Sequence, residues 1–249
     1  MDPALELARL AGRAALVRYR GTIQVDYKAD ASPVTDADRA AERAARDWLA
    51  TRFPDDGILG EEFGETSGTS GREWLIDPID GTRAFVHGIP LWGSLVALVE
   101  QGTVLAGAAV YPALGEELVA APAGGCWHQG RRARVSDVAA LDEATVCTTS
   151  NRFADPAKRD GWDRVCTRAS EARTWGDCVG YLLVATGRAE VMLDPVMNPW
   201  DAACMLPIIE EAGGVFTTWS GKRSALGPDS VATNAALAVT IRTILAGET

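Results

Sequence analysis

Apolar residues near the start of the chain recur with the period of a helix. Leucine and alanine stand every three or four positions over residues 3–19, which predicts a first amphipathic helix. Residues 36–51 are rich in alanine, with arginine and glutamate between the alanines, and they predict a second helix. Two short apolar runs, at 58–60 and 74–76, are typical of buried strands.

The middle of the chain changes to a strand pattern. Residues 91–99, 104–111 and 117–121 are mostly apolar, and the turn dipeptide Gln101-Gly102 separates the first two runs. This spacing predicts successive antiparallel strands.

The second half of the chain alternates strands and helices. The expected elements are a strand at 145–149, helices near 156–170 and 177–187, a strand at 190–193, a helix at 199–212, a strand at 215–219 and a helix at 236–246. The whole pattern predicts a mixed α/β (α+β) fold, with sheets between helix layers and two closely joined subdomains. We place these subdomains at residues 1–135 and 136–249.

Charge and composition narrow the choice of partners and compartment. The 249 residues include 34 acidic and 24 basic ones, and the net charge of −10 disfavours nucleic acid or an anionic membrane surface as a partner. The five cysteines form no C-x-x-C pair, so neither a disulfide framework nor a zinc site is indicated. No apolar run approaches the ~18 residues of a membrane span and no signal-peptide pattern is present, so we expect a cytoplasmic protein.

An acidic segment, Asp77-Pro78-Ile79-Asp80-Gly81-Thr82, follows the second short strand. Because proline restricts the residue before it and fixes its own φ, we expect a short rigid turn that aims Asp77, the Ile79 carbonyl and Asp80 at one point. These are hard oxygen donors, which suit Mg²⁺ better than zinc or copper. Gly81-Thr82 would open a helix whose unpaired N–H groups can bind phosphate. An Asx-type turn with solvated carboxylates would explain the same residues without a metal.

Two further acidic positions also stand at the ends of expected elements. Glu61-Glu62 follows the strand at 58–60, where a solvated loop is the simpler interpretation. Asp201 lies in the first turn of the helix that Asn198 caps and Pro199 begins, where it could simply complement the helix dipole. Together with residues 77–82, these sites favour a common metal centre, which would let an acidic protein bind an anionic phosphate.

These acidic motifs resemble the signature of the inositol monophosphatase superfamily. The matching segments are Gly60-Glu61-Glu62, Asp77 to Thr82, and Trp200-Asp201-Ala202-Ala203 with Glu210-Glu211-Ala212-Gly213-Gly214. They stand in the family's order and spacing, and the resemblance covers roughly residues 28–220. It implies a layered αβαβα sandwich and a Mg²⁺-dependent, lithium-sensitive phosphomonoesterase.

Within the superfamily, the chain is most similar to the histidinol-phosphatases. That likeness is carried by Lys28 to Thr35, Gly81 to Phe85, Leu91 to Leu95 and Gly176-Asp177-Cys178. It implies hydrolysis of L-histidinol phosphate in histidine biosynthesis, by a homodimer of the kind common in the family. Two alternatives stay open: a phosphatase for inositol phosphate or another small phosphomonoester, and a non-catalytic regulatory or scaffold protein.

The resemblance also implies roles for single residues. It assigns two or three Mg²⁺ ions to Glu61, Asp77, the Ile79 carbonyl, Asp80 and Asp201. It assigns the orientation and deprotonation of the attacking water to Thr82 and Asp38, together with Glu61. The amides of Gly81 and Thr82 would hold the phosphate, and the organic part of the substrate would meet Gly176, Asp177 and Asp194 beside Asp80 and Asp201. Residues 1–135 would then carry most metal ligands, and residues 136–249 would carry Asp201 and the substrate pocket.

Overall fold

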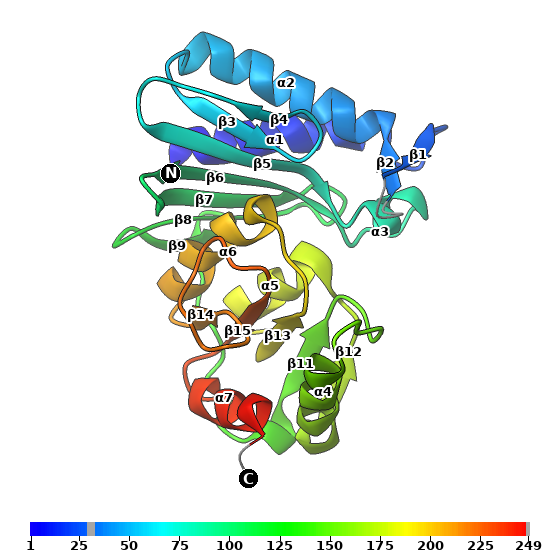
Figure 1. Cartoon of the computed structure of the whole chain (residues 1–249), viewed down its shortest axis with the longest axis vertical. Coiled ribbons are helices and arrows are strands. Elements are labelled where there is room, and N and C mark those ends of the chain that lie inside the picture. The colour runs from blue at the N-terminus through cyan, green and yellow to red at the C-terminus, as the bar shows by residue number, and fades with distance from the viewer. Residues whose placement is uncertain (29–32, 248–249) are drawn as a thin grey trace.

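Five layers make up the molecule (Figure 1). The computed structural model describes residues 1–28 and 33–247. Two long helices, α1 (Asp2–Leu16) and α2 (Asp36–Arg52), lie over one face of the first sheet. Helices α5 (Asp177–Ala185) and α6 (Pro199–Glu211) lie between the two sheets, and α4 (Pro156–Arg168) and α7 (Ala238–Ala246) cover the far face of the second sheet.

The first sheet has eight strands within the described residues. They are β3 (Gly57–Gly60), β4 (Gly64–Thr66), β5 (Arg72–Asp80), β6 (Gly93–Glu100), β7 (Thr103–Tyr111), β8 (Glu116–Ala121), β9 (Gly125–His128) and β10 (Arg131–Arg132). Their spatial order is β10-β9-β8-β7-β6-β5-β3-β4, and only the β3–β5 pair is parallel within this described sheet.

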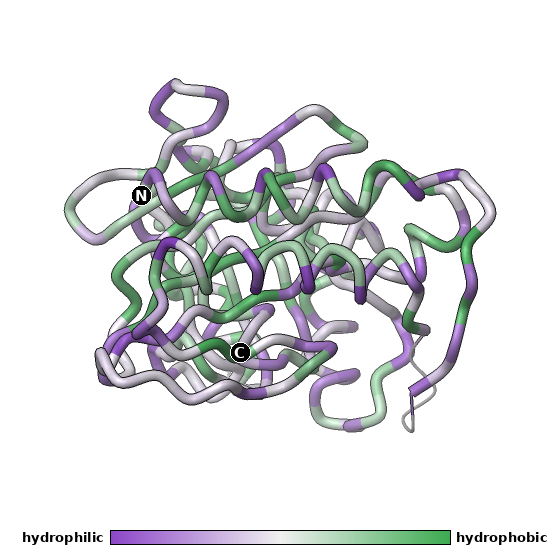
Figure 2. Tube along the Cα trace, turned by 90° about the horizontal axis from the view of Figure 1, so that it is seen from above, coloured by the Kyte–Doolittle hydropathy of each residue, from purple (hydrophilic) through white to green (hydrophobic). Residues whose placement is uncertain are grey.

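Helices cover both faces of the central strands, and the sequence of those strands reflects this. Consecutive residues of β6, such as Leu95, Val96 and Ala97, are all buried, although neighbouring side chains point to opposite faces. One cluster of buried side chains joins the sheet to α1 and α2, and another joins it to α5, α6 and the second sheet. Figure 2 shows α1 and α2 from above, side by side, with hydrophobic and hydrophilic positions alternating along each.

The second sheet contains five strands in the part of the chain described here. They are β11 (Thr145–Thr148), β12 (Glu171–Arg173), β13 (Val191–Asp194), β14 (Val215–Thr217) and β15 (Ser230–Thr233), in the order β12-β11-β13-β15-β14. The remaining elements are the short helix α3 (Thr82–Val86), the 3₁₀ turn Leu141–Glu143, and the antiparallel pair β1 (Val25–Tyr27) and β2 (Pro33–Thr35). No helix among the described residues is both long and apolar enough to cross a membrane.

The predicted mixed α/β fold with αβαβα layers is confirmed, and every predicted helix is present. The strand pattern missed the short strands β1, β2, β4, β9, β10, β12 and β15. The division into subdomains at residue 135 stays a prediction, although that residue does lie between the last strand of the first sheet and the first strand of the second.

One local prediction was wrong. The segment after the second short strand was expected to form a turn, but β5 continues through it as far as Asp80. Pairing with β6 is interrupted between Asp77 and Asp80, and Asp80 then pairs with Gly93. Pro78 has no N–H to donate to a neighbouring strand, so it interrupts the ladder without ending the extended conformation.

The contact between α6 and the first sheet depends on a glycine in β7. A Cβ atom on Gly107 would lie 2.4 Å from the backbone carbonyl oxygen of Cys204 in α6. Because neither backbone can yield easily, we expect Gly107→Ala to lower the free energy of unfolding by about 2 kcal/mol or more. Thermal or urea unfolding measures this loss.

Gly102→Asn is the matched control for that experiment. Gly102 has a φ of 78° in the turn between β6 and β7, where a Cβ would meet nothing within 4 Å. Asparagine tolerates this left-handed conformation, so stability should change by less than about 0.5 kcal/mol. Equal stabilities of Gly107→Ala and the wild type would mean that α6 can shift on the sheet.

Candidate active site

Three aspartates from two distant segments meet between the sheets. Asp77 and Asp80 come from the end of β5, and Asp201 comes from the first turn of α6. One carboxylate oxygen from each lies within 4.8 Å of the others. All three were predicted as metal ligands, and the structure brings them together.

The extended end of β5 aims its polar groups in different directions. The Ile79 N–H donates to Asp77 Oδ1 over 2.9 Å, and the Ile79 carbonyl accepts from the Thr82 hydroxyl over 2.9 Å. The Ser94 hydroxyl donates to the Pro78 carbonyl over 2.6 Å and anchors the interrupted part of the ladder. The N–H of Cys178, in the first turn of α5, donates to Asp80 Oδ2. The acidic end of β5 is therefore fixed by β6, α3 and α5.

Asp201 is held by the start of its own helix. Asp201 Oδ2 accepts from the Asn198 N–H over 2.8 Å and from the Asn198 side-chain amide over 3.2 Å. Pro199 occupies the first helical position, as the sequence predicted. The helix start therefore orients this carboxylate toward the residues of β5.

Crowding and burial disfavour the ionised forms of these three acids. Burial, followed by the charge of Glu61 and of the other aspartates, raises the pKa of Asp77 well above its ordinary value. Burial and the charges of Asp177 and Asp201 raise the pKa of Asp80 in the same way. Burial raises the pKa of Asp201 to about 6. A hard divalent cation would relieve this repulsion, so this all-oxygen cluster fits Mg²⁺.

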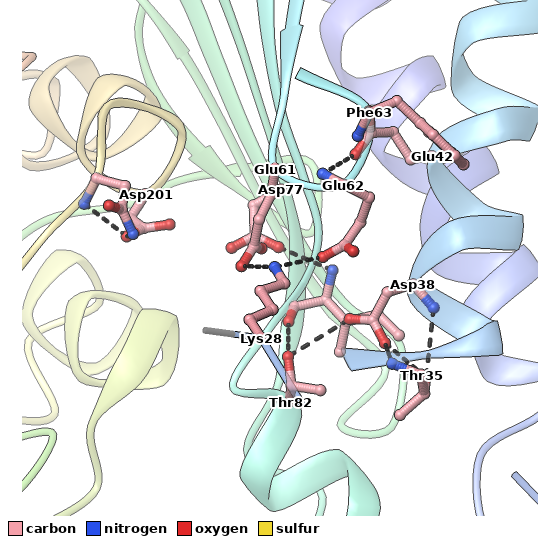
Figure 3. A network of polar contacts seen from close by, with 12 residues as sticks. Lys28, Thr35, Asp38, Glu42, Glu61, Glu62, Phe63, Asp77, Thr82 and Asp201 are labelled. Carbon is pink, nitrogen blue, oxygen red and sulfur yellow. Dashed lines mark hydrogen bonds and ion pairs between the residues drawn. The ribbon is translucent and has the colours of Figure 1, made fainter. Parts of the chain in front are cut away.

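Glu61 and Glu62 lie beside the cluster of three aspartates, and both form an ion pair with Lys28 (Figure 3). The Lys28 ammonium contacts Glu61 and Glu62, each over 2.7 Å. Burial lowers the pKa of Lys28, but its hydrogen bonds to the two glutamates outweigh this and raise it overall. Burial raises the pKa of Glu62 to about 7, although the Lys28 hydrogen bond opposes this. Residues 29–32, part of the motif that begins at Lys28, lie outside the described residues.

The predicted pair Thr82 and Asp38 also comes together (Figure 3). The Thr82 hydroxyl lies 3.4 Å from Asp38 Oδ1, and Asp38 Oδ2 accepts from the Thr35 N–H over 2.8 Å and from the Thr35 hydroxyl over 2.5 Å. Burial raises the pKa of Asp38 to about 6, although the hydrogen bonds from Thr35 oppose this. Asp38 from α2 and Thr82 from α3 therefore form a polar pair beside the acidic cluster.

Gly81 makes the tight connection between β5 and α3. Its φ is 89°, in the left-handed region, and a Cβ there would lie 2.7 Å from the Leu91 carbonyl oxygen. Only glycine meets both requirements without strain. Gly81 therefore lets the chain turn from the acidic end of β5 into α3, whose first residue is Thr82.

A cavity of ≈ 100 Å³ adjoins the acidic cluster and contains the other predicted aspartates. Its polar lining residues include Asp80, Asp201, Asp177, Asp194 and Thr149. Such a volume exceeds what one water molecule needs. A larger cavity of ≈ 380 Å³ lies at the other end of α6 and is lined by none of the predicted site residues.

Thr149 joins the two aspartates of this cavity and was missed in the sequence. Its hydroxyl donates to Asp194 Oδ2 over 2.8 Å and accepts from the Asp177 N–H over 2.9 Å. Gly176 allows this approach, since a Cβ there would lie 2.0 Å from the Thr149 Cα. The available signal was its position just beyond β11, where polar residues often contribute to sites in α/β folds.

Burial raises the pKa of both Asp177 and Asp194 above the ordinary value of an aspartate. Burial raises the pKa of Asp177 to about 6, although the charge of Arg83 opposes this. Burial raises the pKa of Asp194 to about 7, against the hydrogen bond from Thr149. Asp177 also has a φ of 49°, a left-handed conformation that is uncommon outside glycine and asparagine or aspartate. The cavity therefore holds one buried acid, Asp194, and one half-buried acid, Asp177.

The raised pKa of Asp194 predicts that the protein becomes less stable as pH rises toward 7. Between about pH 4 and about pH 7 the folded protein holds a proton on Asp194 that the unfolded chain has released. The stability that this proton gives to the folded state is fully present below pH 3.8 and is lost as pH rises through about 7. Relative to Asp194→Asn, the wild type should therefore lose up to about 1 kcal/mol of unfolding free energy per pH unit in this window.

Urea unfolding at several pH values, with a chelator present, measures that difference. Asp142→Asn, at an exposed residue, is the control and should follow the wild type at every pH. Parallel profiles for the wild type and Asp194→Asn would show that Asp194 titrates normally.

Comparisons with known proteins agree with this architecture. A profile of the inositol monophosphatase family matches residues 1–246. A histidinol-phosphatase of Chlorobaculum parvum is 44% identical over 94% of this chain and 92% of its own, and one of Mycobacterium tuberculosis is 39% identical over 94% and 93%. A solved structure titled as an IMPase of Thermotoga maritima superposes with a TM-score of 0.90 at 32% identity, covering 99% of this chain and 96% of that one. The chain belongs to the inositol monophosphatase family.

Proposed function

We propose that this protein is a Mg²⁺-dependent phosphomonoesterase that hydrolyses L-histidinol phosphate to L-histidinol and phosphate. The observation that carries the proposal is the contiguity of two acidic groups: the cluster of Asp77, Asp80 and Asp201, and the cavity with Asp177 and Asp194. The first group suits a metal-bound phosphate, and the second suits a cationic organic part. Similarity to two histidinol-phosphatases, at 44% and 39% identity, supports the same substrate.

The proposed metal ligands are the three clustered aspartates, Glu61 and the Ile79 carbonyl, which would hold two or three ions. Asp77 is buried and Asp80 lies at the edge of the cavity, so the ligands line one side of the substrate space. Bound Mg²⁺ would supply charge neutralisation for the phosphate and a lowered pKa for an attacking water. Glu61, next to Lys28, would complete the set and take part in water activation.

The remaining chemistry falls to residues of α2 and α3. Thr82 offers its hydroxyl next to the Asp38 carboxylate, which is positioned by Thr35, so the pair can orient a water and accept its proton. The N–H groups of Gly81 and Thr82, at the start of α3, would hold phosphate oxygens. These assignments come from the family resemblance, and the observed proximity of Thr82 and Asp38 supports them.

Substrate choice follows from charge in the cavity. L-histidinol phosphate carries an ammonium group and an imidazole, whereas inositol offers only hydroxyls. Burial raises the pKa of both Asp177 and Asp194, and a cation placed between them would stabilise their ionised forms. Hydroxyls could also donate to these carboxylates, so an inositol phosphate or another small phosphomonoester is the second candidate. The similarity to an IMPase structure at 32% identity favours that alternative.

The proposal places the enzyme in histidine biosynthesis, in the cytoplasm, as a homodimer. A non-catalytic role is disfavoured because every residue that the family resemblance requires is present. Release of phosphate from any phosphomonoester in the presence of Mg²⁺ excludes such a role.

Metal removal and Asp80→Asn test the metal part of this proposal. Chelator-treated protein should lose nearly all phosphatase activity and regain it with Mg²⁺. Asp80→Asn keeps the shape of the side chain but removes an anionic ligand, so activity should fall at least about 100-fold, beyond the roughly 10–100-fold typical of residues that only support a ligand. Phosphate release measures both effects.

Asp142→Asn, an exposed change of the same chemistry, controls for the loss of one charge and should keep wild-type activity. Full activity in excess chelator would exclude a metal mechanism. An Asp80→Asn enzyme that keeps more than half its activity would reduce Asp80 to a structural residue.

Asp177→Asn and Asp194→Asn test the substrate. Each change removes a charge and keeps most hydrogen-bonding capacity, so activity on L-histidinol phosphate should fall at least about tenfold, the equivalent of ~1.4 kcal/mol. Activity on inositol 1-phosphate should change much less, because its hydroxyls can also pair with an amide. Comparison of kcat/KM on the two substrates measures the difference.

Equal losses of activity on both substrates would mean that these aspartates shape the cavity but do not recognise the positive charge of the substrate. Faster wild-type turnover of inositol 1-phosphate than of L-histidinol phosphate would overturn the substrate assignment in favour of the second candidate.

A further inference from the structure

A second buried carboxylate lies on α2, one helical turn beyond Asp38, and the proposed chemistry does not use it. The side chain of Glu42 is 0% exposed and does not line the acidic cavity. Asp38 and Glu42 are four residues apart, so they lie on the same face of the helix. A buried carboxylate costs several kcal/mol unless it is well paired, so the partners of Glu42 show what it does.

Those partners belong to the turn that carries Glu61 (Figure 3). Glu42 Oε2 accepts from the Glu62 N–H over 2.7 Å, and Oε1 accepts from the Phe63 N–H over 3.2 Å. These are the two residues that directly follow Glu61 in the connection between β3 and β4. The carboxylate therefore satisfies the backbone of the turn immediately after a proposed metal ligand.

Arg46 extends the same contact across the turn. Its Nε donates to Glu42 Oε1 over 2.8 Å, Nη1 donates to the Thr66 hydroxyl over 2.9 Å, and Nη2 donates to the Gly64 carbonyl. Glu42 and Arg46 together thus bind four positions between residues 62 and 66. Three of these four contacts are to the backbone, so they hold the path of the chain whatever side chains residues 62 and 63 carry.

Gly60 makes room for the carboxylate. A Cβ on Gly60 would lie 2.0 Å from Glu42 Oε1, so any other residue at the end of β3 would push Glu42 out of place. On the opposite side, the Glu61 N–H donates to the Ile76 carbonyl over 3.2 Å and continues the pairing with β5. The backbone of Glu61 is therefore fixed from the sheet by Ile76 and from the helix by Glu42.

We propose that Glu42 is a positioning residue for the metal site, which sets the place of Glu61 by holding the backbone of residues 62 and 63. The inference rests on the proposed role of Glu61 as a Mg²⁺ ligand. Since Glu42 and Asp38 stand on one helix, α2 then fixes both the residue that accepts the proton and the turn that supplies a ligand.

Calorimetric titration with Mg²⁺ alone tests this without reference to activity. Glu42→Gln presents an N–H₂ group to a backbone N–H, so the turn should loosen and Mg²⁺ should bind about tenfold or more weakly. Glu42→Asp keeps the charge on a side chain one methylene shorter. It should lower the melting temperature less and still weaken Mg²⁺ binding several-fold, so it serves if Glu42→Gln fails to fold.

Asp56→Asn is the matched control. The Asp56 side chain is only 1% exposed and accepts from Arg72, Ser70 and Trp74 at the other end of β3, away from the acidic cluster. It should lower the melting temperature as Glu42→Gln does, with wild-type Mg²⁺ affinity. Wild-type affinity in both Glu42 variants, or equal weakening in Asp56→Asn, would overturn the proposal.

Glu61→Gln separates failure of this inference from failure of the proposed function. Weak Mg²⁺ binding by Glu61→Gln with normal binding by both Glu42 variants would contradict only the positioning role. Wild-type binding by Glu61→Gln would remove Glu61 from the ligand set and overturn both.

Discussion

Repulsion among three crowded carboxylates, one buried and two half-buried, is the constraint on which the rest of this structure depends. Asp77, Asp80 and Asp201 have oxygens within 4.8 Å of one another, and burial strengthens the interaction between their charges. Such a cluster is unfavourable unless protons or cations neutralise it. The fold keeps the three carboxylates in place through hydrogen bonds from the backbone N–H groups of Ile79, Cys178 and Asn198. Because these donors belong to the backbone, they stay fixed if the side chains move apart.

The layered architecture explains how residues so distant in sequence reach one site. β5, an inner strand of the first sheet, carries two aspartates at its carboxyl end, while α5 and α6, packed between the sheets, bring their amino-terminal ends to the same place. Gly107 lets α6 lie close to β7, and Gly60 lets α2 reach the turn after β3. A close approach of backbone to backbone at Gly107, and of a side chain to backbone at Gly60, therefore brings the helices against the sheet that carries the acidic residues.

The acidic residues could be predicted because each stands next to a local signal. Asp77 and Glu61 follow apolar runs, and Asp201 follows Asn198-Pro199, so the sequence showed that each ends or begins an element. Thr149 also stands at the end of an expected strand, but its partners Asp177 and Asp194 lie 28 and 45 residues away, so its role could not be read locally. Glu42 stands inside a helix with no signal beside it, and its partners lie 20 and 21 residues away. The continuation of β5 beyond Pro78 was also hidden, because it depends on pairing between Asp80 and Gly93.

Proton release on Mg²⁺ binding tests the central claim most directly. If a divalent cation replaces protons in the cluster, binding near pH 6 must expel protons from acids such as Asp201, whose pKa burial raises to about 6. Asp77 and Asp80, whose pKa values burial also raises well above the ordinary value, contribute in the same direction. Calorimetric titrations in buffers of different ionisation enthalpy count those protons. The account predicts proton release on Mg²⁺ binding near pH 6, and less release near pH 8, where Asp201 is already ionised. Binding of Mg²⁺ without proton release at either pH, or no binding at all, would contradict it.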